Sequence, residues 1–191
     1  MRIEWLFIAL IVVASCSQEY LPKPKGYNRI LLPDASYTSL PDTLPYDFEY
    51  SAHAQIFKDT SWISEPYWLD LYYPYFDATV QITYKPINKD SLLEDYLSDS
   101  YRLTAKHNVK AYSIEEKIIV TTSGNVASVT ELEGEVPSQM QFHTTDSTTH
   151  FLRGSLYFKM STKNDSLAPA VTFIKQDIIH MLNTLEWRML N

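Results

Sequence analysis

Apolar and polar residues alternate in short segments that begin at residue 46, and this period of two is typical of β-strands with one buried face. The clearest case is segment 79–84, in which Val80, Ile82 and Tyr84 share one face. The same reasoning predicts strands at 46–50, 67–76, 79–84, 117–122, 126–133, 140–145 and 150–160. The last four form two hairpins, with turns at 123–125 and 146–148.

The predicted strand at 150–160 has an irregular pattern. Phe151, Leu156 and Phe158 cannot share one face of a regular strand, and Gly154 lies between them. We therefore predict a β-bulge at Gly154.

Two further segments have apolar residues at the spacing of an α-helix. The first runs from about residue 90 to 107 and has Asn88 or Asp90 as its N-cap. The second runs from about residue 166 to 187 and has Asp165 or Ser166 as its N-cap. The predicted buried faces consist of Leu92, Leu93, Tyr96, Leu97, Tyr101, Leu103 and Thr104 in the first helix, and of Val171, Ile174, Ile178, Met181, Leu182 and Leu185 in the second. This order of elements predicts an α+β fold, with a mainly antiparallel sheet covered by two main helices.

The predicted domain, residues 46–191, follows a proline-rich segment at 16–45. Proline fixes φ and removes a hydrogen-bond donor, so this segment is predicted to be an extended tether or a strap over the domain. The apolar residues Ile30, Leu31 and Leu32 favour a strap that packs.

Residues 1–15 have the pattern of a secretory signal peptide. Arg2 precedes an apolar run from Trp5 to Ala14, which is too short to span a bilayer. Val13-Ala14-Ser15-Cys16 resembles the bacterial lipobox, in which the signal peptidase recognises the residues before an acylated cysteine. We therefore predict that Cys16 carries the lipid that anchors the mature chain to a membrane.

Composition limits the classes of function. Removal of residues 1–15 takes away one basic and one acidic residue, so the net charge of the mature chain stays at −7. The chain has no Lys/Arg cluster, which argues against nucleic acid as a partner. It has no glycine-rich nucleotide motif, and Cys16 is its only cysteine, so no disulfide, cofactor or cysteine metal site is predicted.

The hairpin at 140–160 gathers the best local set of candidate catalytic residues. They are His143, Asp146, Ser147, His150 and Arg153. A serine hydrolase needs an oriented base and an oxyanion hole, and zinc needs a third ligand that the sequence does not supply. The alternative is an ordinary polar turn, with Arg153 paired to an acid on a neighbouring strand.

Segment 67–76 is rich in aromatic residues. If one face of this strand fills the core, then Tyr72, Tyr73, Tyr75 and Phe76 form a candidate interaction surface for protein or glycan. The alternative is a strand that is buried on both faces under the strap.

Five blocks of sequence together resemble the GldD family of gliding-motility lipoproteins of the Bacteroidetes. These blocks are YLPKPKGYNRILLP at 20–33, YYPYFDATVQITYKP at 72–86, AKHNVKAYSIE at 105–115, FHTTDSTTHFLRGSLYF at 142–158 and DSLAPAVTFIKQDIIHMLNTLEW at 165–187. The strand-rich body and the last helix also resemble the PsbP/Mog1-like α+β sandwich.

The family resemblance implies an accessory or assembly lipoprotein of the cell envelope, needed for gliding motility and for the linked type IX secretion system. It implies no enzymatic activity and a partner of the GldE type, a membrane protein. Of the family's residues, only Cys16 has a defined role. Ser17-Gln18-Glu19 is only a weak version of the acidic stretch that exports Bacteroidetes lipoproteins to the cell surface, so we expect the protein to face the periplasm. The residues leave a glycan-binding module and an envelope hydrolase as alternatives.

Overall fold

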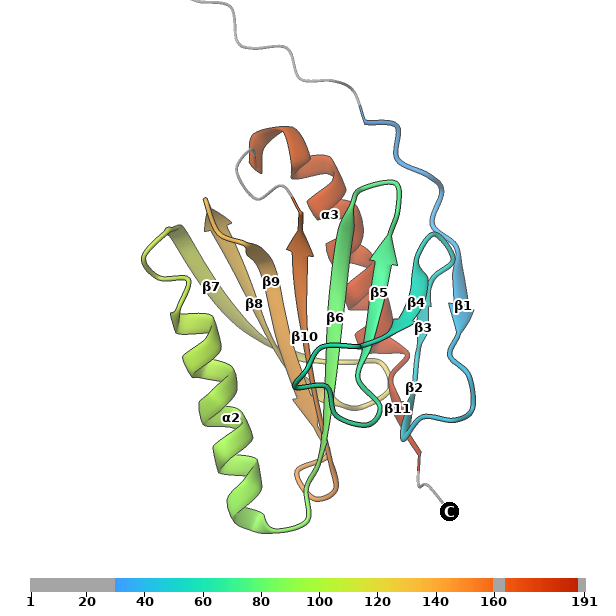
Figure 1. Cartoon of the computed structure of the whole chain (residues 1–191), viewed down its shortest axis with the longest axis vertical. Coiled ribbons are helices and arrows are strands. Elements are labelled where there is room, and N and C mark those ends of the chain that lie inside the picture. The colour runs from blue at the N-terminus through green and yellow to red at the C-terminus, as the bar shows by residue number, and fades with distance from the viewer. Residues whose placement is uncertain (1–29, 160–163, 189–191) are drawn as a thin grey trace, which may run out of the picture.

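The computed structural model describes residues 30–159 and 164–188 (Figure 1). These residues form two helices, a seven-stranded antiparallel sheet in the order β4-β5-β6-β10-β9-β8-β7, and two small two-stranded sheets, β1-β3 and β11-β2. The elements are β1 (Tyr37–Ser39), β2 (Tyr46–Asp47), β3 (Glu49–Ser51), β4 (Gln55–Lys58), β5 (Leu69–Tyr73), β6 (Ala78–Pro86), α2 (Asp90–Ala105), β7 (Ala111–Val120), β8 (Val126–Gly134), β9 (Ser138–Thr145), β10 (His150–Phe158), α3 (Asn164–Asn183) and β11 (Glu186–Trp187). The predicted α+β class is therefore confirmed.

The two helices lie on opposite faces of the seven-stranded sheet, which we call the α2 face and the α3 face (Figure 1). The α3 face forms the core, as the alternation in β6 predicts: Val80 and Ile82 are at most 1% exposed. Ile174 and Ile178 of α3 are buried in the same cluster. Burial of such side chains contributes about 1.5–3 kcal/mol each, so α3 is the helix that stabilises the sheet.

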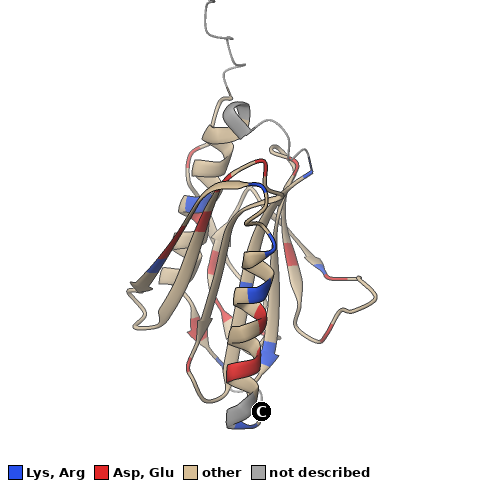
Figure 2. Ribbon diagram, turned by 90° about the vertical axis from the view of Figure 1, so that its left-hand side faces the viewer, with Lys and Arg blue, Asp and Glu red and all other residues tan. Residues whose placement is uncertain are grey.

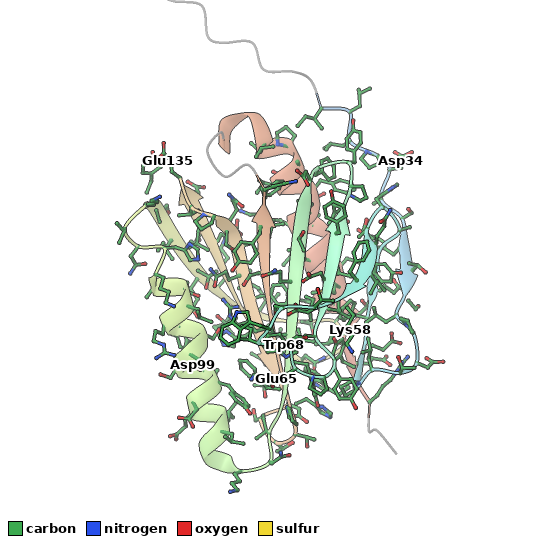
Figure 3. The ribbon with its side chains drawn as sticks, viewed as in Figure 1. Asp34, Lys58, Glu65, Trp68, Asp99 and Glu135 are labelled. Atoms are coloured by element: carbon green, nitrogen blue, oxygen red, sulfur yellow. The ribbon has the colours of Figure 1, made fainter. Side chains whose placement is uncertain are left out.

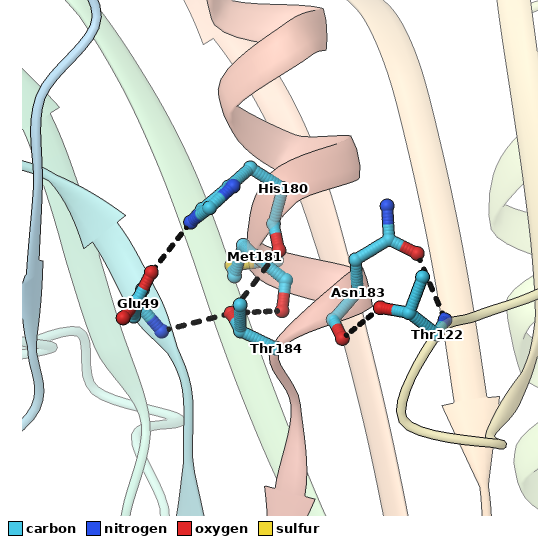
Figure 4. Close-up of polar contacts among 6 residues, drawn as sticks. All are labelled: Glu49, Thr122, His180, Met181, Asn183 and Thr184. Carbon is cyan, nitrogen blue, oxygen red and sulfur yellow. Dashed lines mark hydrogen bonds and ion pairs between the residues drawn. The ribbon is translucent and has the colours of Figure 1, made fainter.

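Polar contacts fix the end of α3 to elements on both of its sides (Figure 4). His180 Nε2 lies 2.7 Å from Glu49 Oε2, and the amide of Glu49 donates to Thr184 Oγ1 at 3.0 Å. On the other side, the amide of Thr122 donates to Asn183 Oδ1 at 3.1 Å. The helix therefore joins β3 to the turn between β7 and β8.

The described part of the proline-rich segment packs against the body: Ile30 is half-buried against the core, and continuous contacts begin at Asp34, whose carbonyl lies 2.8 Å from His53 Nε2. β1 pairs with β3, and the Tyr37 ring stacks on the ring of His180 with centroids 3.6 Å apart. Leu40 is 5% exposed, whereas Leu31 is 67% exposed. Residues 1–29, which include the predicted signal peptide and Cys16, lie outside the described residues.

Helix α2 is attached more loosely than its sequence predicts. Of the α2 side chains that the structure describes, only Ser100 is buried. Leu93 and Leu97 are half-buried and Tyr101 is 50% exposed, so the predicted buried face was wrong. The physical reason is that α2 covers the polar face of the sheet, which has no extensive apolar surface against which the helix could pack. Its N-cap is Lys89, which makes no side-chain capping hydrogen bond, rather than Asn88 or Asp90.

The predicted bulge at Gly154 was also wrong. β10 keeps an unbroken register with β6, because Phe151 points to the α2 face while Leu156 and Phe158 belong to the core on the α3 face. The irregularity lies between Leu156 and Tyr157, on the side of β9.

The last helix ends earlier than predicted. α3 stops at Asn183, and the chain then forms β11, which pairs with β2. Leu185 is buried after the helix, and Trp187 packs against the core as a strand residue. The side chains of the predicted N-cap residues Asp165 and Ser166 lie outside the described ones.

Candidate functional site

The candidate catalytic residues of the β9–β10 hairpin do not converge. The register pairs Arg153 with His143, which places both on the α2 face. His150 has the parity of Leu152, which is buried in the core on the α3 face. The sheet therefore separates the two histidines that the hairpin hypothesis would bring together.

Each histidine packs against an aromatic ring and lies within hydrogen-bond distance of a hydroxyl group. His150 Nδ1 lies 2.8 Å from the Tyr84 hydroxyl, and its ring stacks on Trp187 with centroids 5.1 Å apart. His143 Nδ1 lies 3.2 Å from Ser100 Oγ, and its ring stacks on Phe151. Burial lowers the pKa of both imidazoles below the usual value, so both are held neutral as packing groups.

Asp146 closes the turn rather than orienting a base. Its Oδ1 accepts hydrogen bonds from the amides of Thr148, Thr149 and His150, at 3.0, 2.8 and 2.8 Å. Burial raises the pKa of this carboxyl, but the three backbone donors outweigh it and hold the pKa below its usual value. Ser147 adopts a φ of 66° in the same turn. In the described residues, no three His, Cys, Asp or Glu side chains form a metal-binding group.

The predicted aromatic surface divides between core and solvent. Tyr73 and Phe76 are 2% and 8% exposed and pack in the core, so their prediction as surface residues was wrong. The reason is register, because Tyr73 falls on the α3 face with Leu69 and Leu71. Tyr72 is half-buried, and Tyr75 is left as the one largely exposed ring of the four.

A groove of about 790 Å³ lies on the α2 face, between α2 and the loop at 59–68. Figure 3 shows Glu65 and Trp68 in front of the sheet, to the side of α2, which carries Asp99. Trp68 Nε1 donates to the Tyr84 carbonyl at 2.8 Å, and this bond fixes one wall. The rings of Tyr96 and Phe151, with centroids 5.5 Å apart, form part of another.

Arg153 lies at the floor of this groove, half-buried on β10. Its Nη2 donates to Gln141 Oε1 at 2.6 Å, and no described carboxylate lies within ion-pair distance of the guanidinium. The predicted pairing of Arg153 with an acid on a neighbouring strand is therefore not found within the described residues. Burial lowers the pKa of Arg153, because removal from water disfavours the charged guanidinium.

A second exposed feature is β7, the edge strand of the sheet. Among the described residues it pairs with β8 alone, and none of its ten residues is buried. Its side chains Ile118 and Val120 are 64% and 76% exposed, and they continue into Val126 on β8 and Tyr101 on α2, both about half exposed. We call these four residues, with Ile114, the β7 patch.

Sequence reasoning did not find the groove or the β7 patch. Asp70 and Arg153 are charged residues inside predicted strands, and such residues can indicate a functional site. They are 83 positions apart, however, and only the strand order brings them to one face. Ile118 and Val120 lie in a predicted strand whose place at the sheet edge has no sequence signal.

The fold and these surfaces define a small α+β domain with two candidate binding features, in which the candidate catalytic side chains are dispersed. The chain belongs to the family of gliding motility lipoproteins GldD, whose model matches residues 17–187. As a lipoprotein of that family, it is a membrane-anchored protein of the cell envelope. None of the helices in the described residues has the length and apolar character needed to cross a membrane.

Among solved structures, the chain is similar to cyanobacterial PsbP (CyanoP) from Synechocystis sp. PCC 6803. The sequence identity is 13% and the TM-score is 0.49, with 84% of this chain and 97% of the other covered. No curated protein sequence matches this chain.

Proposed function

We propose that this protein is an accessory or assembly factor of the gliding machinery and of the linked type IX secretion system, and that it acts by binding other envelope proteins. In this proposal, lipid on Cys16 holds the domain at the membrane, facing the periplasm. The family supplies the link to gliding motility, and the surface of the domain suggests how binding occurs.

The observation that carries the proposal is the open edge of β7. An unpaired edge strand presents a row of backbone N–H and C=O groups, and natural proteins usually shorten, cover or charge such edges. The opposite edge, β4, has only four residues, whereas β7 has ten and exposes Ile118 and Val120 beside it. An edge of this length spans about 33 Å, long enough to pair with an extended segment of another chain.

The partner is, in this proposal, an envelope protein with an extended segment whose apolar side chains alternate. Such a segment would pair with the β7 backbone and place every second side chain against the β7 patch. A hollow of about 380 Å³ lined by Leu97, Tyr101, Ile118 and Val126 lies next to the strand and would receive one of these side chains. A membrane protein of the GldE type is the partner we propose.

The proposed role is non-catalytic. The dispersal of His143 and His150 to opposite faces supports this over an envelope hydrolase, because nucleophilic catalysis needs base and nucleophile within hydrogen-bond reach. The burial of Tyr73 and Phe76 removes half of the surface on which a glycan-binding role would depend.

Motility tests the proposal. The double substitution Ile118→Lys/Val120→Lys is expected to abolish colony spreading, since it adds two charges to the patch that the partner would cover. Both side chains are more than 60% exposed, so the free energy of unfolding is expected to change by no more than about 0.5 kcal/mol. The thermal midpoint and the amount of protein in the envelope are therefore expected to stay close to those of the wild type.

Val109→Lys is the matched control, because Val109 is 90% exposed but precedes the strand. This variant is expected to spread normally. Normal spreading of the Ile118→Lys/Val120→Lys strain, with normal protein levels, would refute the role of the edge.

A further inference from the structure

The groove beneath α2 holds charged groups of both signs that do not neutralise one another. Arg153 lies on its floor, and Lys106, His107 and Lys110 line the side where α2 ends. Asp59 and Asp70 line the other side, beneath the loop at 59–68. Figure 2 shows the same polarity along α2, which is acidic toward its start and basic toward its end.

Two other charged groups of the groove, Lys85 and Asp99, are already paired. Lys85 forms an ion pair with Glu65 and lies over the Trp68 ring, 5.3 Å from its centroid. Asp99 is bound by Arg102 at 2.8 Å. Within the described residues, Arg153 and Asp70 have no ion-pair partner, and the same holds for the more peripheral Asp59, Lys106 and Lys110.

Around Arg153, hydrogen-bond donors are also in excess. Gln141 Oε1 accepts from Arg153 Nη2 and from Thr104 Oγ1, at 2.6 and 3.0 Å, so the amide nitrogen of Gln141 points elsewhere. That nitrogen, Arg153 Nε and Ser155 Oγ are buried without a hydrogen-bond partner in the described structure. Gln141 and Ser155 are a registered cross-strand pair, so the three atoms belong to neighbouring positions on β9 and β10. Buried donors of this kind are costly unless an acceptor reaches them, and an anion is the acceptor that satisfies a guanidinium best.

At the other side of the groove, the carboxylate of Asp70 lacks a positively charged partner. Burial raises the pKa of its carboxyl, and the nearby charge of Asp59 raises it further. Asp59 itself accepts hydrogen bonds from the amide and hydroxyl of Ser61. A cation bound between the two carboxylates would relieve both the burial and the repulsion.

We propose that this groove binds a short zwitterionic peptide, or an amino-acid derivative of similar length, with its carboxylate on Arg153 and its ammonium group on Asp70 and Asp59. This site is independent of the β7 patch and of the function proposed for it.

The spacing of the two strand positions indicates the size of the ligand. Asp70 pairs with Gln81, Gln81 pairs with Ser155, and Arg153 is two residues further along β10. Two strand spacings across and two residues along give a separation of about 12 Å between the backbones of Asp70 and Arg153. An extended tripeptide spans about 10 Å, and the groove volume lies within the usual range for small-ligand sites.

The walls define the middle of the ligand. Trp68, Tyr96 and Phe151 offer apolar and aromatic surface between the charged ends. Such surface stabilises an uncharged side chain through burial, at about 25 cal/mol per Å². We therefore expect a peptide whose central residue is apolar or aromatic.

The test uses the full lipoprotein in detergent and the tripeptide Ala-Phe-Ala as the probe, with binding followed by ligand-observed NMR. The probe with two free ends is expected to bind with a millimolar dissociation constant or tighter, and the C-terminal amide and the N-acetyl form are each expected to bind about tenfold more weakly. Arg153→Gln is expected to erase the difference between acid and amide, and Asp70→Asn the difference between free and acetylated amine.

Lys159→Gln and Glu94→Gln are the matched controls, because they remove one charge of each sign at exposed positions outside the groove lining. Both are expected to keep both differences. Arg153→Lys, which keeps the charge, is expected to retain the preference for acid over amide, and thermal midpoints show which variants fold. Equal binding of all three peptides to the unmodified protein, or no binding at about 10 mM, would overturn the proposal without reference to any variant.

Discussion

Replacement of Gly154 by alanine is expected to lower the free energy of unfolding by about 2–3 kcal/mol. A Cβ at Gly154 would lie 2.0 Å from Cζ of Phe142, its registered neighbour on β9, and 2.4 Å from Cε1. Phe142 is 2% exposed, so its ring has no free space into which to move. Alanine reduces the entropy of the unfolded chain and so contributes about 0.4–1 kcal/mol in the opposite direction, which is too little to offset the collision.

The comparison that isolates this contact is the same substitution in a Phe142→Leu background, measured by chemical denaturation. The smaller leucine leaves room for the new methyl group, so Gly154→Ala is expected to cost less than half as much there. An equal cost in both backgrounds would mean that Gly154 serves the backbone of β10 and not the packing of Phe142.

The second large effect is expected at Cys16, and it is all-or-none. Cys16→Ala is expected to abolish incorporation of an acyl label and to leave residues 1–15 attached, because the lipid is added through the thiol before the peptidase cuts. Each buried methylene of an acyl chain contributes about 0.8 kcal/mol, so the two chains that we expect on Cys16 would hold the wild-type protein on the membrane permanently. Intact-mass analysis of the purified chain gives both readouts together.

Ser17→Ala, one position after the cysteine, is the control and is expected to be acylated and cut normally. An acylated Cys16→Ala chain, or a wild-type chain without lipid, would contradict the assignment of Cys16.

The alternation of apolar residues predicted the central strands of the sheet well, because one face of each of these strands packs in a single core. Val80, Ile82 and Tyr84 share a buried face as predicted, and both hairpins form around the predicted turns. Helical spacing of apolar residues predicted the position of α2 but not its burial. Leu97 and Tyr101 have this spacing, but they face a polar side of the sheet with a hollow beside it. Amphipathic spacing indicates which side of a helix faces the sheet and leaves open how closely the helix packs.

The candidate site was harder to predict because it depends on strand parity and strand order. The register of β9 and β10 places His143 on the α2 face and His150 on the core face. A shift of either strand by one residue would move every side chain of that strand to the opposite face. The groove needs Asp70 from β5 and Arg153 from β10, which meet only because β6 lies between them. Sequence alone supplies neither the register nor the order of the strands.

The most direct test of the central claim is photo-crosslinking in living cells, with a photoreactive residue placed at Ile118 or at Tyr75, one position at a time. The two side chains are 64% and 63% exposed, so they are equally open to solvent, but only Ile118 lies on the edge strand. The account predicts a specific adduct with an envelope protein from Ile118, lost when Val120→Lys is added, and no such adduct from Tyr75. An adduct from Tyr75 with none from Ile118 would contradict it, and would move the binding surface to the turn between β5 and β6.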